Sequence, residues 1–186
     1  MADLSKLQTA DVFSWSLLGD IQNARAGLGD TMPVAVYRLF EYTMRETLIE
    51  ALSKDAAIAL FREAGRKAGF HFAQNMLGSL KEKAEFIEEL QQKFIEMKIG
   101  VLRVESIDAN GTMILTISED LDCSGLPIVG ETVCNYDEGF LAGVFQQHYK
   151  KRFCAIETDC WAKGDRVCRF KVQQAIGEEN AKEGKI

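Results

Sequence analysis

Three cysteines and one glutamate in the second half of the chain constrain its fold more than any other feature. Glu157, Cys160 and Cys168 lie around a short glycine-containing turn, and Cys134 precedes them by about the length of one helix. If the segments that flank the turn are antiparallel strands, the turn brings the first three side chains to one end of a hairpin. Zn²⁺ prefers four ligands in a tetrahedron, and thiolates are among its strongest protein ligands. These residues therefore predict a metal site, with Cys134 as the fourth ligand.

The predicted ligands also indicate what the metal does. Three thiolates and one carboxylate fill every position around Zn²⁺, and closed sites of this kind are structural rather than catalytic. The chain has five cysteines, an odd number that does not match the paired framework of a small secreted domain. Cys123 and Cys154 are then expected to be spare thiols. The alternative, reduced cysteines that only fill the core, stays open.

Two runs that contain these residues, GETVCNYDEGFLAG and ETDCWAKGDRVCRF, resemble the 4-vinyl reductase domain. The resemblance is most specific over residues 126–172 and extends to 34–76. It implies a small-molecule-binding module that occurs alone and as the sensory domain of aromatic-responsive transcription regulators, with a fold akin to vesicle-tethering subunits and haem-dependent nitric-oxide sensors. In the sensory members, three cysteines and a glutamate hold a zinc ion. The corresponding residues here are Cys134, Glu157, Cys160 and Cys168.

Charge and hydropathy limit the partners that we expect. The net charge is -6, the isoelectric point is near 5.1, and no cluster of five or more Lys and Arg residues is present to match a phosphate backbone. We therefore expect no direct binding to nucleic acid. The sequence has no run of ~18 apolar residues and no signal-peptide pattern at its start, so we expect no membrane span and a cytoplasmic protein.

Apolar residues recur at three- and four-residue spacing in three segments of the first half, which predicts three amphipathic helices. The first begins near Pro33, the second runs from about Ala56 to Met76 with Asp55 as its cap, and the third follows Ser79. The stripe of the first helix, which we expect to face the core, comprises Val36, Leu39, Phe40, Met44, Leu48, Ile49 and Leu52.

Two glycines lie on the apolar face of the second predicted helix. Glycine inside a helix costs roughly 1 kcal/mol relative to alanine, so Gly65 and Gly69 need a reason. One explanation is the close approach of another helix or of a sheet, and the other is room for a ligand. Both explanations remain open on the sequence alone.

The helical period gives way to alternation after Gly100. Alternating apolar and polar residues predict one hairpin over 102–117 and a second over 152–172, with a helix between them that begins near Cys134. Helices first, then a hairpin, a helix and a second hairpin predict an α+β fold, in which helices cover an antiparallel sheet of about four strands.

The candidate ligand pocket combines apolar side chains from several of these elements. The sensory relatives hold a phenolic hydroxyl with a histidine and a tryptophan, and the tryptophan position corresponds here to about Met113. The resemblance therefore favours a hydrocarbon, an aromatic or a lipid-like ligand. His71 is either a hydrogen-bonded boundary residue or a ligand contact, including an axial ligand of haem. The candidate residues, each of which could instead fill the core, are Phe61, Gly65, Gly69, His71, Phe72, Met113, Leu115 and Phe145.

No nucleophile elbow, phosphate-binding loop or dinucleotide fingerprint is present, so an enzyme is not our first expectation. We interpret the chain as a zinc-stabilised sensor domain that responds to a small ligand by a conformational change and passes the signal to a separate protein. The expected organisation is an arm over 1–30 that contacts a second subunit of a homodimer, a ligand-binding domain over 31–173 and a polar tail over 174–186. The alternatives are an auxiliary protein of tetrapyrrole 4-vinyl reduction, a haem-based gas sensor and a tethering subunit.

Overall fold

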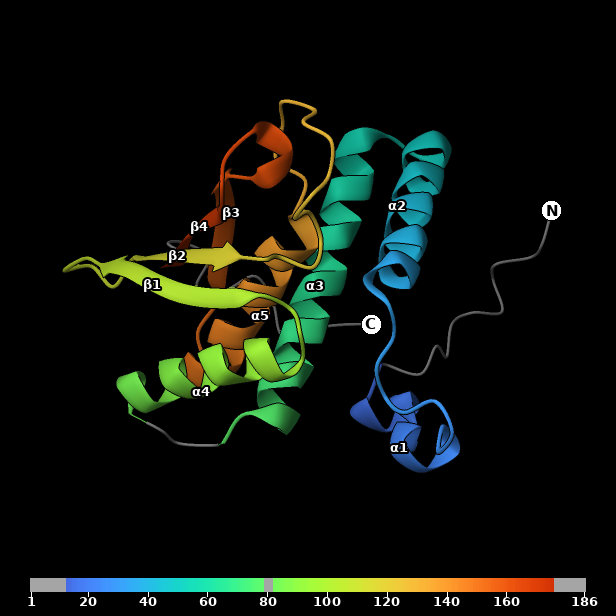
Figure 1. Ribbon diagram of the computed structural model, residues 1–186. Helices are drawn as coiled ribbons and strands as arrows, with labels where there is room; N and C mark the ends of the chain where they lie inside the picture. Colours follow the sequence, from blue (N-terminus) through green and yellow to red (C-terminus); the bar gives the residue numbers. More distant parts are fainter. Residues whose placement is uncertain (1–12, 79–81, 176–186) are drawn as a thin grey trace, which may run out of the picture. The chain divides into compact units, whose positions relative to one another are not determined.

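One antiparallel sheet forms the scaffold of the larger unit of the chain (Figure 1). The computed structural model describes residues 13–78 and 82–175. The strands follow the order β1-β2-β4-β3, so that the two predicted hairpins join through β2 and β4. The α+β fold with an antiparallel sheet is therefore confirmed. The strands are β1 (Val101–Ile107), β2 (Met113–Ser118), β3 (Phe153–Asp159) and β4 (Cys168–Gln174).

The two central strands supply the buried face of the sheet. Leu115 of β2 lies opposite Phe170 of β4, and both side chains are fully buried. The pairing of β3 with β4 shifts between Glu157 and Asp159. Such a bulge changes the direction of the local side chains, and here it lies at the predicted metal site.

Four helices accompany the sheet in the described part of this unit (Figure 1). The last of them, α5, contacts both the sheet and α3, and every residue from Asn135 to Phe145 except Tyr136 is buried. None of the helices in the described ranges combines the length and the hydropathy needed to cross a membrane. The helices are α2 (Val34–Ala51), α3 (Lys54–Met76), α4 (Lys83–Glu96) and α5 (Asn135–Tyr149).

Glycines allow α3 and α5 to pack backbone against backbone. A Cβ atom on Gly65 would overlap the carbonyl oxygen of Tyr136, and one on Gly69 would overlap that of Phe140. The contact is reciprocal, because Cβ atoms on Gly139 and Gly143 would overlap carbonyl oxygens of α3. The space beside Gly65 and Gly69 is therefore occupied by α5, which is the first of the two explanations that the sequence left open.

The start of α3 differs from the prediction by two residues. The Ser53 hydroxyl, not the Asp55 carboxylate, accepts a hydrogen bond from the backbone N–H of Ala56 at 3.2 Å and caps the helix. The predicted cap Ser79 lies outside the described residues, as does most of the predicted tail.

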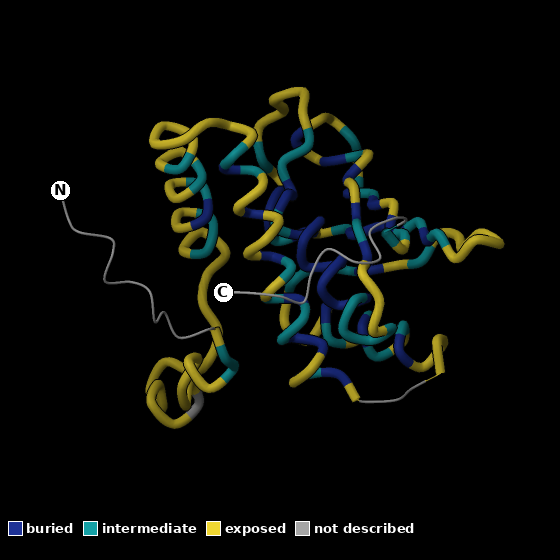
Figure 2. The backbone as a smooth tube through the Cα atoms, turned by 180° about the vertical axis from the view of Figure 1, so that it is seen from behind, coloured by how far each residue is buried: buried dark blue, intermediate teal, exposed yellow. Residues whose placement is uncertain are grey.

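The orientation of α2 is opposite to the one that its apolar stripe predicted. Leu39 and Phe40 are 69% and 65% exposed, whereas Glu41 is the one buried residue of this helix. Figure 2 shows α2 mostly in the colour of exposed residues. Polar side chains hold the helix in this orientation, since Arg38 donates to the carbonyl oxygen of Leu121 at 2.7 Å. The expectation that the stripe from Val36 to Leu52 faces the core is wrong.

The chain divides into two compact units, Met1–Pro33 and Val34–Ile186. In the first unit, the described residues form the 3₁₀-helix η2 (Trp15–Leu18) and the short helix α1 (Ile21–Ala24). Asp20 caps α1 by accepting a hydrogen bond from the Asn23 backbone N–H at 3.2 Å.

Candidate functional site

Four buried cysteines come together at one end of the sheet. Their sulfur atoms all lie within 4.8 Å of one another. The sulfurs come from the loop after β2, the residue before α5, the end of β3 and the start of β4. Segments far apart in the sequence therefore meet at one point. The four cysteines are Cys123, Cys134, Cys160 and Cys168.

The distances within this cysteine cluster suit a tetrahedral metal site in part. Four sulfurs at the usual Zn–S distance would stand roughly 3.8 Å from one another. The sulfur of Cys134 lies 3.8 Å from that of Cys160 and 3.7 Å from that of Cys168. The sulfur of Cys123 lies only 3.0 Å from that of Cys168, although all cysteines are free thiols. A buried cluster of four cysteines that could bind a metal ion is thus present.

Hydrogen bonds between the thiols separate their proton affinities. The pKa of Cys160 is lowered because the thiols of Cys123, Cys134 and Cys168 stabilise its thiolate. The pKa values of Cys134 and Cys168 are raised, first by their hydrogen bonds with Cys123. One thiolate surrounded by three thiols is a ready starting point for a metal, which displaces the remaining protons as it binds.

Glu157 lies beside the cysteine cluster. One carboxylate oxygen accepts a hydrogen bond from the Cys134 backbone N–H at 3.0 Å, and the other oxygen is buried without a hydrogen-bond partner. Burial, together with the nearby Cys160, raises the pKa of Glu157 to about 9. The unpartnered oxygen suits a metal ligand, so the expectation that Glu157 completes the site stays a prediction. Cys123, which we expected to be spare, is a member of the cluster.

Buried carboxylates surround the cysteine cluster, and sequence reasoning missed them. Asp137 and Glu138 occupy the first turn of α5, a position that in itself indicates only a favourable interaction with the helix dipole. In the folded chain both are buried, and Glu138 accepts a hydrogen bond from the Glu157 backbone N–H at 2.9 Å. Glu138 also accepts one from Arg62 of α3 at 2.5 Å, so it fixes β3 relative to two helices.

The eight candidate ligand residues do not line one common cavity. Phe72, Met113, Leu115 and Phe145 belong to the buried core cluster. Phe61 lines a groove between α2 and α3. Gly65 and Gly69 contact α5, as described above, and the ring of His71 makes an edge contact with Phe70.

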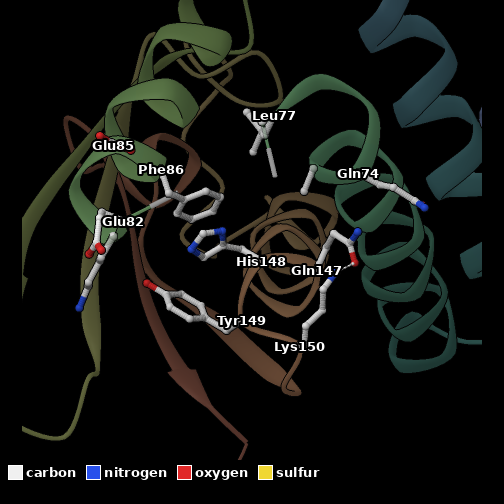
Figure 3. Close-up of a pocket in the computed structure, with 12 residues that line it drawn as sticks. Gln74, Leu77, Glu82, Glu85, Phe86, Gln147, His148, Tyr149 and Lys150 are labelled. Atoms are coloured by element: carbon white, nitrogen blue, oxygen red, sulfur yellow. Dashed lines mark hydrogen bonds between the residues drawn. The ribbon is translucent and has the colours of Figure 1, made fainter. Parts of the chain in front are cut away.

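A cavity of about 560 Å³ lies where the end of α3, the start of α4 and the end of α5 meet (Figure 3). The rings of Phe86 and His148 stack in this cavity with their centroids 3.6 Å apart. The hydroxyl of Tyr149 is buried there without a hydrogen-bond partner. Burial lowers the pKa of His148, which favours the neutral imidazole. The cavity thus combines aromatic faces with hydrogen-bonding groups, a composition typical of small-molecule sites.

Solved structures define the class of this fold. The phenol-responsive sensory domain of the transcription activator PoxR, solved with phenol, has a TM-score of 0.59 at 16% identity and covers 77% of this chain and 75% of that one. A vinyl-4-reductase family protein from Methanocaldococcus jannaschii has a TM-score of 0.57 at 19% identity over 95% and 99% of the two chains. A trafficking protein particle complex subunit 3 from Naegleria fowleri, covalently bound to palmitic acid, has a TM-score of 0.55 at 13% identity over 76% and 97%. At these identities the likeness concerns the fold.

Sequence comparison then identifies the domain. Residues 113–174 match the family model of the 4-vinyl reductase domain, and the resemblance to this family is confirmed. Two Methanocaldococcus jannaschii proteins are similar to this chain. MJ0150 is 26% identical over 147 residues, which are 78% of each protein. MJ1642 is 35% identical over 104 residues, which are 56% of this chain and 62% of that protein.

Proposed function

We propose that this protein is a zinc-stabilised sensor domain that binds a small aromatic or lipid-like molecule in the cavity between α3, α4 and α5. The observation that carries the proposal is the composition of this cavity, in which stacked rings of Phe86 and His148 adjoin the unpartnered hydroxyl of Tyr149. Similarity to the PoxR sensory domain supports the same function. The ligand would act by favouring one conformation of the three helices, because only differential binding shifts an equilibrium.

A matched pair of substitutions tests the cavity. Gln74 and Asn75 are neighbouring exposed residues of α3, but only Gln74 lines the cavity. Phenol and n-octanol serve as the aromatic and the lipid-like probe, measured by titration calorimetry with the full chain. We expect Gln74→Trp to weaken binding at least tenfold and Asn75→Trp to leave it unchanged. Failure of both probes to bind the wild-type chain, or equal binding by the two variants, would argue against this site.

Zinc would connect the start of α5 to the last hairpin through Cys134, Cys160 and Cys168. For the fourth ligand we favour Cys123 over Glu157, since the sulfur of Cys123 is already within 4.8 Å of the other three. Four thiolates leave no open coordination position, so the ion would be structural. Such an ion stabilises the wall of the cavity rather than taking part in a reaction.

Cobalt substitution distinguishes the two candidate ligands. Sulfur-to-cobalt charge transfer increases with the number of bound thiolates, so Cys123→Ser should lower its intensity by about one quarter if four thiolates bind. Glu157→Gln should then leave the intensity and the metal content unchanged. Cys154→Ser is the control, because Cys154 lies outside the cluster. Loss of metal in Glu157→Gln with an unaltered Cys123→Ser spectrum would assign Glu157 instead.

We also propose that the protein is a cytoplasmic homodimer that signals to a separate protein. Apolar side chains of the N-terminal unit support a subunit contact, since Leu17 and Leu28 are exposed. Deletion of residues 1–33 should convert the dimer into a monomer in light scattering. A dimer that persists after the deletion would exclude this unit as the interface.

A further inference from the structure

A second cavity, independent of the proposed ligand site, lies between α2 and α3. Its volume is about 470 Å³, and its walls are mainly apolar. The orientation of α2 creates this groove, because the stripe that the sequence predicted to be internal is turned toward it and toward solvent. The principal apolar lining residues are Phe40, Met44, Leu48, Leu60 and Phe61.

One acidic residue interrupts this apolar lining. Glu41 is only 4% exposed, and neither of its carboxylate oxygens has a hydrogen-bond partner. Burying a carboxyl group without a partner is costly, and buried polar groups are nearly always paired with protein, water or ligand. Glu41 therefore requires a donor that its own chain does not supply.

The neighbouring donors are already engaged. The closest cation, Arg45, has its Nη2 atom 3.8 Å from Glu41, beyond hydrogen-bonding distance. Arg45 instead donates to Asn135 at 2.8 Å and to the Val133 carbonyl oxygen at 2.6 Å. The Tyr37 hydroxyl, which also lines the groove, donates to Asp122 at 2.8 Å.

The charges near Glu41 favour a positively charged donor over a neutral one. Asp122 is close enough to raise the pKa of Glu41, while Arg38 and Arg45 only partly offset the effect of burial. Arg38 is bound to the carbonyl oxygen of Leu121. An additional cation beside Glu41 would restore the ionised carboxylate and form a charge-assisted hydrogen bond, which is about twice as strong as a neutral one.

We propose that the groove between α2 and α3 binds an apolar molecule with one terminal ammonium group, which donates to Glu41 while the apolar part lies against Phe40, Met44 and Leu60. The volume of the groove falls in the range typical of small-molecule sites. The ligand class differs from that of the first cavity, because the recognition group here is a single buried carboxyl. A helix of another protein that presents a lysine has similar chemistry, and the experiment below separates the two.

Hexylamine and hexanol are suitable probes, because they share the apolar part and differ in the charged group. Calorimetric titration of the full chain should show hexylamine binding at least tenfold more tightly than hexanol. Glu41→Gln keeps the shape of the side chain and removes its charge, so it should abolish this difference. Circular dichroism of the variant establishes that it is folded.

A second variant tests the groove without altering Glu41. Ala64 lines the groove and Ala59 is an exposed residue of the same helix that does not. Ala64→Trp should weaken both probes at least tenfold, and Ala59→Trp should leave both unchanged. Absence of hexylamine binding to the wild-type chain, or a preference for hexylamine that survives in Glu41→Gln, would overturn the proposal. A change in subunit number in Ala64→Trp with intact hexylamine binding would instead identify the groove as a protein interface. Because phenol binding depends on Gln74, failure here leaves the proposed sensor function unaffected.

Discussion

Gly69 of α3 lies so close to the carbonyl oxygen of Phe140 in α5 that a single added carbon atom would overlap it. We therefore expect Gly69→Ala to lower the free energy of unfolding by roughly 3 kcal/mol, the upper end of the usual cost of overpacking, because both collision partners are backbone. Urea denaturation measures this change. Gly27→Ala is the control, since a Cβ atom there has no neighbour within 4 Å. Equal effects of the two substitutions would show that the helices can separate without cost.

Removal of the proposed metal should destabilise the protein and change the environment of Trp161. This residue lies in the 3₁₀-helix η3 (Trp161–Lys163), directly after Cys160, and its indole N–H donates to the Leu126 carbonyl oxygen at 3.1 Å. A chelator should lower the unfolding free energy by several kcal/mol, since metal binding and folding are coupled. The fluorescence of Trp161 should shift to the red in a Trp15→Phe background, which removes the only other tryptophan. An unchanged spectrum and stability in chelator would contradict a structural metal.

Stability should depend on pH through Glu41. Burial first, and then the charge of Asp122, raise the pKa of Glu41 from 4.5 to about 8, while Arg45 and Arg38 act in the opposite direction. Between these two pKa values the folded state retains a proton that the unfolded state has lost. The contribution of Glu41 therefore becomes less favourable as pH rises through this window.

Glu41→Gln removes this contribution. The stability of the variant relative to the wild type should increase from about pH 5 to about pH 8, at up to roughly 1.4 kcal/mol per pH unit. Other buried carboxylates titrate in both proteins, so the difference between the two isolates Glu41. A constant difference across this range would mean that Glu41 is ionised in the folded state.

Tyr149→Phe should not destabilise the protein. The Tyr149 hydroxyl is buried without a partner, and removal of such a group can be neutral or stabilising by about 1 kcal/mol. The same change should weaken phenol binding several-fold, if the hydroxyl contacts the ligand. Tyr42→Phe is the matched control and should destabilise by about 1 kcal/mol, because the Tyr42 hydroxyl donates to the Asp122 carbonyl oxygen at 3.1 Å. A larger loss of stability in Tyr149→Phe than in Tyr42→Phe would contradict the assignment.

The elements could be predicted because their signals are local. Three- and four-residue spacing marks α3 and α4, and alternation marks the hairpins, with Met113, Leu115 and Ile117 all buried as their pattern indicates. The direction in which α2 faces could not be predicted in this way. Periodicity identifies the residues that share a face, but the hydrogen bonds of Arg38 and Arg45 to distant carbonyl oxygens decide which face lies inside.

The site was predictable in proportion to its closeness in sequence. Cys160 and Cys168 belong to one hairpin, and their meeting follows from a single turn. Cys123 joins them because the irregular segment after β2 folds back, with the Leu121 N–H donating to the Ile99 carbonyl oxygen at 2.8 Å. No spacing rule describes such a path. The one signal available was a further cysteine near Cys134 in the sequence.

The reversed orientation of α2 also determines how the protein can open. Helices usually resist detachment because apolar surface would become wet, yet α2 buries one residue, and that residue is a glutamate. Its separation from the rest of the unit would break hydrogen bonds that water can replace, and it would leave the contact between α3 and α5 intact. The protein therefore has an outer layer that can exchange with solvent at a lower free energy than global unfolding, and the buried carboxylates beneath it would become accessible in the same event.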